Sequence, residues 1–380
     1  MNRRILLYDT SWEAFGGGEK YLLMMAEVLS TVPHYQIELL VDTPVVTRER
    51  VEKSFNIALR NVRITTVDRG AVRARLRDAD TVVVMSNYLP FGKPAPTTIY
   101  VLQIPYPQIT IGTVLVDILH GLFRESVKNI SRAYLLHDAR SADGVLVYSR
   151  FVQRTLLDNH DITTTVLFPP IDDFALSVRK DNTILSAGRF FSGMYNDKRY
   201  DILINAFKRL CAVVPNLHLE YHIAGNCAAD RQAQDYLDAL KKAAHGYPVF
   251  FHVNASYQEL HTLYNLATLF WHAAGFGVNE DSAPERAEHF GMTTVEAMSA
   301  SCVPIVINRG GQKEIVSHGE SGYLWETIDQ LVDMTADLML HPDRIIPLQR
   351  NARARFRDFD RAHFTASLLS FFHQLEQKHQ

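Results

Sequence analysis

Two glutamates, Glu288 and Glu296, lie eight positions apart on either side of a Phe-Gly pair. The pair interrupts any preceding periodic structure, and the residues after it have helical character, with Thr293 or Thr294 as the expected N-cap. Free N–H groups at a helix start attract a phosphate, and carboxylates accept hydrogen bonds from vicinal hydroxyls. A nucleotide-sugar carries both kinds of group. An ordinary helix cap with surface glutamates would give the same pattern, so this run alone leaves both interpretations open.

Arg189 and Lys198 lie nine positions apart in the loop that follows a predicted strand at 184–187. An arginine can hold a diphosphate through two parallel hydrogen bonds, and a lysine can add a point charge. We expect these two cations to converge on a diphosphate. Solvated surface cations are the alternative interpretation.

Three consecutive glycines, Gly16 to Gly18, come between the first predicted strand and a helix. Glycines at such a turn let the backbone approach a ligand closely and offer N–H groups to an anion. Their spacing matches neither a Walker loop nor the dinucleotide-binding fingerprint, and a plain tight turn would also explain them.

The sequence shows neither the nucleophile motif of hydrolases nor the histidine motif of zinc proteases. His272 ends a predicted strand, and it either faces a ligand cleft or occupies a core or surface position.

Cys211, Cys227 and Cys302 lie far apart without paired spacing, so we expect buried free thiols. The sequence therefore predicts neither a disulfide framework nor a metal site.

At 380 residues the chain is longer than one hydrophobic core usually serves, and its 47% apolar composition supplies enough core for two domains. The formal net charge of -3 shows no global basic field. This balance argues against nucleic acid as the principal partner.

Short β-rich runs alternate with amphipathic helical patterns along both halves of the chain, which predicts parallel sheets covered on both faces. The predicted strands lie at 5–8, 37–41, 82–85, 99–103 and 145–148, and then at 184–187, 219–224, 250–253, 269–272 and 303–307. Two consecutive prolines, Pro169 and Pro170, interrupt the pattern, and a last amphipathic segment covers 361–375. We therefore predict two doubly wound α/β domains, whose ligands lie beyond the carboxyl ends of the strands.

The first apolar run is too short for a signal peptide, and no stretch reaches transmembrane length without a charge. We expect a soluble, cytoplasmic protein, with peripheral contact to the inner face of the membrane as an open alternative. Residues 114–123, with Arg124, Lys128 and Arg132 beyond them, would either lie on a membrane surface or form a half-buried helix.

In their order and spacing, these motifs resemble those of the retaining glycosyltransferases of family 4, over nearly the whole chain. The motifs are Gly16-Gly17-Gly18-Glu19, Phe168-Pro169-Pro170-Ile171-Asp172, Gly188-Arg189 with Lys198, Glu288 with Glu296, and Gly310-Gly311-Gln312-Lys313-Glu314-Ile315-Val316. The resemblance implies the GT-B fold, in which two Rossmann-like domains face each other across a cleft. The run from Tyr100 to Pro107 and the two prolines also resemble the mannosyltransferases that extend lipid-linked oligosaccharides.

Carried over by position, the resemblance assigns roles to individual residues. Glu288 would hold hydroxyls of the donor sugar, Glu296 those of the ribose, and the two cations the diphosphate. The implied catalytic residues are Glu288, Arg189 and Lys198; the donor-binding residues are Gly17, Gly18, Asn254, Gly291, Met292, Thr293 and Glu296; the acceptor-side residues are Gln103 and His120. Preorganised cations and backbone dipoles would stabilise the leaving group without a metal ion.

Two features depart from the family pattern. Many relatives carry a histidine where this chain has Gln103, and a glutamine cannot act as a general base at neutral pH. The departing phosphate would then take the acceptor proton, as in the front-face mechanism proposed for the family. The loop at 275–286 is also longer and more acidic than the usual link, and it either shapes a pocket or decorates the rim.

The sequence and the resemblance together imply an acceptor-binding domain at 1–168, a nucleotide-sugar-binding domain at 169–355 and a C-terminal helix at 356–380, with a return of this helix to the N-terminal domain as an open alternative. We expect a retaining transferase without cofactor that moves a mannose- or glucose-type hexose from a nucleotide diphosphate sugar to a glycan or lipid-linked acceptor. The alternatives are a non-catalytic glycan- or nucleotide-binding protein of the same fold, and a GT-B epimerase or phosphorylase.

Overall fold

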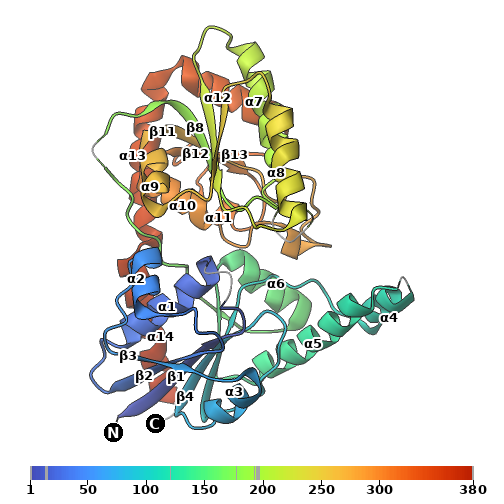
Figure 1. The fold of residues 1–380 in the computed structure, drawn as a ribbon, viewed down its shortest axis with the longest axis vertical. Helices are drawn as coiled ribbons and strands as arrows, with labels where there is room; N and C mark the ends of the chain where they lie inside the picture. The colour runs from blue at the N-terminus through green and yellow to red at the C-terminus, as the bar shows by residue number, and fades with distance from the viewer. Residues whose placement is uncertain are drawn as a thin grey trace. The chain divides into compact units, whose positions relative to one another are not determined.

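The computed structural model describes residues 2–12, 16–119, 121–176, 178–191, 193 and 197–378. The chain divides into two compact units, one formed by residues 1–170 with 362–380 and the other by residues 171–361. Each unit consists of a parallel sheet with helices packed on its faces (Figure 1).

Within the described residues, the first unit holds a seven-stranded sheet in the order β3-β2-β1-β4-β5-β6-β7, and all neighbouring strands pair in parallel. Every residue of β4 and β5 is buried, as expected for strands covered on both faces. The strands are β1 (Arg3–Asp9), β2 (Tyr35–Val41), β3 (Val62–Thr66), β4 (Thr81–Met85), β5 (Thr97–Leu102), β6 (Gly144–Val147) and β7 (Thr165–Val166). The helices are α1 (Gly17–Leu29), α2 (Arg48–Phe55), α3 (Arg69–Leu76), α4 (Ile111–Leu119), α5 (Phe123–Arg140), α6 (Arg150–His160) and α14 (Arg361–Lys378).

The second unit, over the residues that the structure places, holds a six-stranded parallel sheet in the order β10-β9-β8-β11-β12-β13. The strands are β8 (Asp181–Ala187), β9 (Glu220–Gly225), β10 (Val249–Val253), β11 (Ala267–His272), β12 (Val303–Ile307) and β13 (Tyr323–Trp325). The helices are α7 (Tyr200–Val213), α8 (Arg231–Ala244), α9 (Tyr257–Leu266), α10 (Met292–Ser299), α11 (Gln312–Ile315), α12 (Ile328–Leu340) and α13 (Ile345–Phe356). In the described part of this unit, three short 3₁₀ helices cover Pro284–Arg286, Pro342–Arg344 and Arg357–Phe359.

The predicted fold class is confirmed, and each of the ten predicted strands overlaps a strand of the structure. The sequence interpretation missed the three edge strands β3, β7 and β13. In both sheets the strand order reverses beside the first strand of the unit, between β1 and β4 and between β8 and β11. Ligands of doubly wound folds bind beyond the carboxyl ends of the strands at such a reversal.

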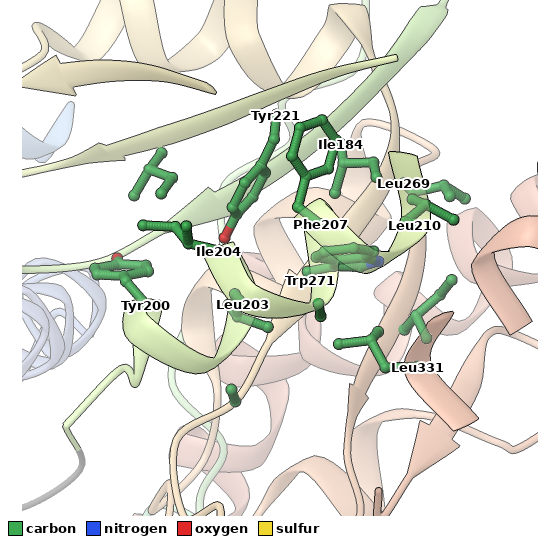
Figure 2. Close-up of a cluster of buried hydrophobic side chains, with 14 of the residues drawn as sticks. Ile184, Tyr200, Leu203, Ile204, Phe207, Leu210, Tyr221, Leu269, Trp271 and Leu331 are labelled. Atoms are coloured by element: carbon green, nitrogen blue, oxygen red, sulfur yellow. The ribbon is translucent and has the colours of Figure 1, made fainter. Parts of the chain in front are cut away.

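An aromatic centre fills the core of the second unit (Figure 2). The ring of Tyr221 lies 5.4 Å from that of Phe207 and 5.5 Å from that of Trp271, measured between centroids. The indole Nε1 of Trp271 donates to Thr335 Oγ1 at 3.1 Å, which satisfies its one polar atom. Successive residues of a strand point to opposite faces, so the next residue of β11, His272, points away from this core.

The segment at 114–123 does not form one helix. Helix α4 ends at Leu119, and α5 begins at Phe123, after Gly121 adopts a positive φ of 72°. The amide of Asn129 in α5 donates to the Asp117 carboxylate in α4 at 2.8 Å, which ties the two helices together. None of the described helices is both long enough and apolar enough to span a bilayer.

Candidate active site

Glu288 forms the centre of the site in the second unit. Lys198 Nζ lies 2.5 Å and His272 Nε2 lies 3.0 Å from the same carboxylate oxygen, Oε2. Among the described residues, no hydrogen bond engages the second oxygen, Oε1. One oxygen therefore anchors the carboxylate, and the other remains available to accept a hydrogen bond from a ligand hydroxyl.

The charge of Glu288 depends on these two neighbours. Burial disfavours the ionised carboxylate, but the positive charge of Lys198 and the hydrogen bond from His272 outweigh burial and hold the pKa of Glu288 well below its usual range. The carboxylate is therefore ionised at neutral pH although its side chain is only 10% exposed.

His272 supplies a neutral donor. Burial lowers the pKa of His272, against the opposite effect of its hydrogen bond to Glu288. A carboxylate can only accept, so the proton of the neutral ring is on Nε2. The other ring nitrogen, Nδ1, is buried and meets no partner among the described residues.

Lys198 reaches Glu288 across the loop that follows β8. A Cβ atom at Gly188 would lie 3.0 Å from Cε of Lys198, so the lysine side chain passes directly over this glycine. Arg189, the other predicted diphosphate ligand, is exposed, and its guanidinium carbon lies 5.1 Å from the centre of the Phe191 ring. The structure therefore brings Lys198 and Glu288 together, whereas no described contact joins Arg189 to either of them.

The backbone around Glu288 is fixed by the loop after β12. The N–H of Gly311 donates to the carbonyl of Glu288 at 2.8 Å. Gly310 has a φ of 56°, and its Cα lies so close to the Glu288 backbone that a Cβ there would clash with the same carbonyl. Only glycine satisfies both conditions, which explains the glycine at position 310.

Helix α10 begins with Met292, and its N-cap is Gly291 without a side-chain cap. The prediction of Thr293 or Thr294 as N-cap is therefore wrong. Gly291 adopts a φ of 121°, and a Cβ there would lie 2.7 Å from Nε2 of Gln312, so this position requires glycine.

The first turn of α10 offers donors to an anion. The first N–H of this helix with a backbone acceptor is that of Thr294, which donates to the carbonyl of Gly291 at 3.0 Å. Among the described residues, the N–H groups of Met292 and Thr293 have no such acceptor. A helix start with free N–H groups four residues after Glu288 suits a phosphate.

Two other predicted donor-site residues already have protein partners. Glu296 Oε2 accepts a hydrogen bond from the hydroxyl of Tyr264 at 2.8 Å. Asn254 adopts a positive φ of 57°, and its side-chain oxygen accepts from the N–H of Cys227 at 3.0 Å. Asn254 therefore ties the ends of β9 and β10 together, and its role beside a base remains a proposal.

In the first unit, the structure brings two of the predicted residues together. A Cβ atom at Gly18 would lie 3.0 Å from Nε2 of Gln103, so the first turn of α1 lies against the end of β5. Gly17 is the first residue of α1. His120, predicted on the acceptor side, lies outside the described residues.

The long loop at 275–286 is attached to the Gly-Gly loop through Glu280. This carboxylate accepts from the N–H of Gly310 and from Lys313 Nζ, the latter at 2.6 Å. Glu280 was not predicted as a site residue, and for His272 the sequence left a cleft-facing role and a core or surface role open. Polar side chains at the carboxyl edge of the sheet were the available signal, and it does not distinguish a ligand contact from a structural one.

No group of three or more histidine, cysteine or acidic side chains within the described part of the chain has a geometry that could hold a metal ion. The donor groups found at the site are a lysine, a neutral histidine and helix N–H groups.

Part of the chain matches a known protein family. Residues 170–357 match the family model of the group 1 glycosyl transferases. The chain is similar to the GDP-Man:Man(3)GlcNAc(2)-PP-Dol alpha-1,2-mannosyltransferase of Xenopus laevis, with 26% identity over 248 residues, or 60% of this chain and 48% of that protein. The Xenopus tropicalis enzyme of the same name is 28% identical over 250 residues, with the same coverage. The chain thus spans about half the length of these curated relatives.

Solved structures agree on the fold. Anabaena HepE in complex with UDP and glucose aligns with a TM-score of 0.69 and 17% identity, over 98% of this chain and 100% of that chain. A glycosyltransferase from Rickettsia africae aligns with a TM-score of 0.70 and 14% identity, over 99% of both chains. Residues 170–357 are therefore similar to the group 1 glycosyl transferases, and the chain has the fold of the GT-B glycosyltransferases.

The neutral state of His272 predicts a pH-dependent stability of the second unit. The folded-state pKa of His272 lies below the ordinary histidine value of 6.5, so the unfolded chain takes up this proton first as pH falls, and the free energy of unfolding decreases below that pH. His272→Gln keeps a donor but cannot titrate. When the pH is lowered from neutral to below 6.5, we expect the free energy of unfolding to fall less in the variant than in the wild type. The difference between the two slopes should reach at most about 1.4 kcal/mol per pH unit.

Urea unfolding curves recorded at neutral pH and at a pH below 6.5 measure this difference. The exposed His218→Gln is the matched control, and it should retain the wild-type pH dependence. Equal pH dependence in the wild type and His272→Gln would contradict the assignment of a neutral His272.

Proposed function

We propose that this protein is a retaining glycosyltransferase of family 4 that transfers a hexose from a nucleotide diphosphate sugar to a glycan or lipid-linked acceptor. The observation that carries the proposal is the arrangement around Glu288. Lys198 and His272 hold Oε2 of this carboxylate, whereas no hydrogen bond from the described residues engages Oε1. Four residues later, a helix begins with free N–H groups. The group 1 domain supports the same class of reaction.

In this proposal Glu288 binds the hexose. Oε1 accepts hydrogen bonds from hydroxyls of the sugar, and His272 and Lys198 hold the carboxylate in its charged form. Lys198 and the N–H groups of Met292 and Thr293 face the diphosphate, where negative charge grows as the bond from the sugar to phosphate breaks. Arg189 reaches the diphosphate from its exposed position.

The chemical step proceeds on one face of the sugar. The acceptor hydroxyl oxygen forms a bond to the anomeric carbon while the bond from that carbon to the β-phosphate oxygen breaks. Gln103 cannot take the acceptor proton, so the proton passes to the departing phosphate oxygen. Attack from the leaving-group side retains the anomeric configuration.

The donor we propose is GDP-mannose, because the similar Xenopus proteins bear the name of GDP-mannose-dependent enzymes. Lipid-linked acceptors are named in the same relatives, and this chain covers only 48% of their length, so the acceptor class rests on that likeness alone. UDP-glucose is the second donor to test, since HepE has been crystallised with it.

A transfer assay with GDP-mannose and UDP-glucose tests the proposal. We expect turnover of one donor, a product with the anomeric configuration of the donor by NMR, and a rate that survives excess EDTA, because lysine and helix N–H groups take the place of a divalent ion. Inverted configuration would contradict the retaining mechanism. Loss of the rate in EDTA with recovery in magnesium would contradict the metal-independent site.

Glu288→Gln tests the central residue. The charge-assisted contacts to the sugar are worth roughly 1.5 to 3 kcal/mol, so kcat/KM should fall about tenfold or more. Affinity for the free nucleoside diphosphate, which lacks the sugar, should change much less than kcat/KM does.

The exposed Glu320→Gln is the matched control and should transfer at the wild-type rate. Wild-type kcat/KM in Glu288→Gln would remove Glu288 from the proposed site.

A further inference from the structure

Exposed large apolar side chains cluster on one part of the first unit. Of the 21 exposed large hydrophobic residues in the described chain, nine lie on α4, on α5 or between them. These are Ile111, Leu115, Ile118, Leu119, Leu122, Phe123, Val127, Ile130 and Tyr134, which we name the apolar stripe. Soluble proteins rarely expose so many large apolar side chains together unless the surface has a binding partner.

The spacing of the stripe follows one helical face. On α5 the exposed residues Phe123, Val127, Ile130 and Tyr134 recur at the intervals of four and three that place side chains on one side of a helix. The buried residues of the last turns, Leu135, Leu136 and Ala139, join the core of the first unit. The helix is thus anchored by its C-terminal turns, while α4 and the start of α5 extend away from the sheet (Figure 1).

Cations lie on α5 beside the apolar stripe and on the face opposite to it, where Arg132 donates to the side-chain oxygen of Asn129 at 2.9 Å. Arg124, Lys128 and Arg132 recur every four residues on α5 and lie roughly 100° or more around the helix from Phe123. Lys128 pairs with Glu125 at 2.6 Å. An apolar face bordered by a cationic row is the pattern of a helix that lies in the interface of a membrane.

A basic pocket of about 650 Å³ continues the stripe at Tyr134, which lines the pocket. Its cations are Arg73, Arg77 and Lys93, and its one carboxylate is Asp138. The N–H of Gly92 already donates to Asp138 at 2.6 Å.

The cations of the pocket differ in what they contact. Arg73 donates to the carbonyl of Pro90 at 2.8 Å, and Lys93 pairs with Asp143 at 2.7 Å. Among the described residues, the Arg77 side chain has no hydrogen-bond or ion-pair partner. The pocket therefore offers positive charge to an anion directly beside apolar side chains.

We propose that the apolar stripe and the basic pocket bind the surface of an anionic lipid bilayer. The apolar side chains enter the headgroup region, and Arg73, Arg77 and the α5 cations meet lipid phosphates. The inference does not depend on the donor chemistry of the second unit, because every residue in it belongs to the first unit.

A second copy of the chain fits this surface less well. In a symmetric dimer the same patch meets itself, so the cationic row and the basic pocket of one copy would lie close to those of the other. Like charges at such an interface oppose association, whereas an anionic membrane neutralises them. Charge complementarity therefore selects the membrane as the occupant.

Co-sedimentation of the full chain with vesicles tests the inference. We expect binding to vesicles that mix phosphatidylcholine with phosphatidylglycerol, weaker binding at high salt, and little binding to phosphatidylcholine alone. Phe123→Ser should weaken partitioning by roughly tenfold, through loss of the apolar contact. Arg77→Gln should weaken it by about fivefold, through loss of one cation near the surface.

Two controls in the second unit match these changes. Ile346→Ser alters an apolar residue that is 69% exposed, and Arg231→Gln alters an exposed arginine. Both should bind vesicles as the wild type does.

Three vesicle results would overturn the inference: no binding by the wild type, equal binding to both kinds of vesicle, or wild-type binding by both Phe123→Ser and Arg77→Gln. A fourth contradicting result is a protein that binds no vesicles but forms a dimer in ultracentrifugation, if Phe123→Ser abolishes this dimer. Transfer to a soluble acceptor would survive all four, so failure here is distinct from failure of the proposed function.

Discussion

A buried carboxylate held in its charged form is the interaction on which the site depends. Glu288 lies where burial alone would favour the neutral acid, and Lys198 and His272 reverse that preference through one shared oxygen. Removing either partner leaves a buried charge less compensated, which costs more than a surface ion pair contributes. A ligand at Oε1 would therefore meet a charged carboxylate because Lys198 and His272 contact its other oxygen, Oε2.

Backbone packing places that carboxylate. The Gly310-Gly311 loop after β12 lies against the backbone at Glu288, and Gly291 starts α10 where it meets Gln312. On the other side of β11, the aromatic core around Trp271 fixes the strand from which His272 projects. Side chains far apart in the sequence thus meet at one point because the ends of β8, β11 and β12 lie at the same edge of the sheet.

The sequence predicts the parts of this structure that follow from local pattern. Central strands such as β4 and β5 are continuous apolar runs, so their positions and their parallel pairing were predictable. The edge strands β7 and β13 have only two and three residues, too few for a periodic signal. The N-cap of α10 was mispredicted because it is Gly291, which has no side chain to cap with, whereas the prediction followed the capping preference of threonine.

The site was predictable as a set of residue types but not as a set of contacts. Glu288 and Lys198 were expected to bind different parts of one ligand, and the structure adds that they bind each other across 90 positions of sequence. The participation of His272 could not be separated from a core role, since a histidine at a strand end is compatible with both. Such distinctions depend on tertiary distances, which periodicity and spacing do not contain.

A crystal structure of the protein with GDP-mannose bound is the most direct test of the central claim. The account predicts a hexose hydroxyl within about 3.2 Å of Glu288 Oε1, with His272 Nε2 still on Oε2 and the diphosphate at Lys198 and the start of α10. A hexose bound away from Glu288, or a diphosphate that contacts neither Lys198 nor the N–H groups of α10, would contradict it.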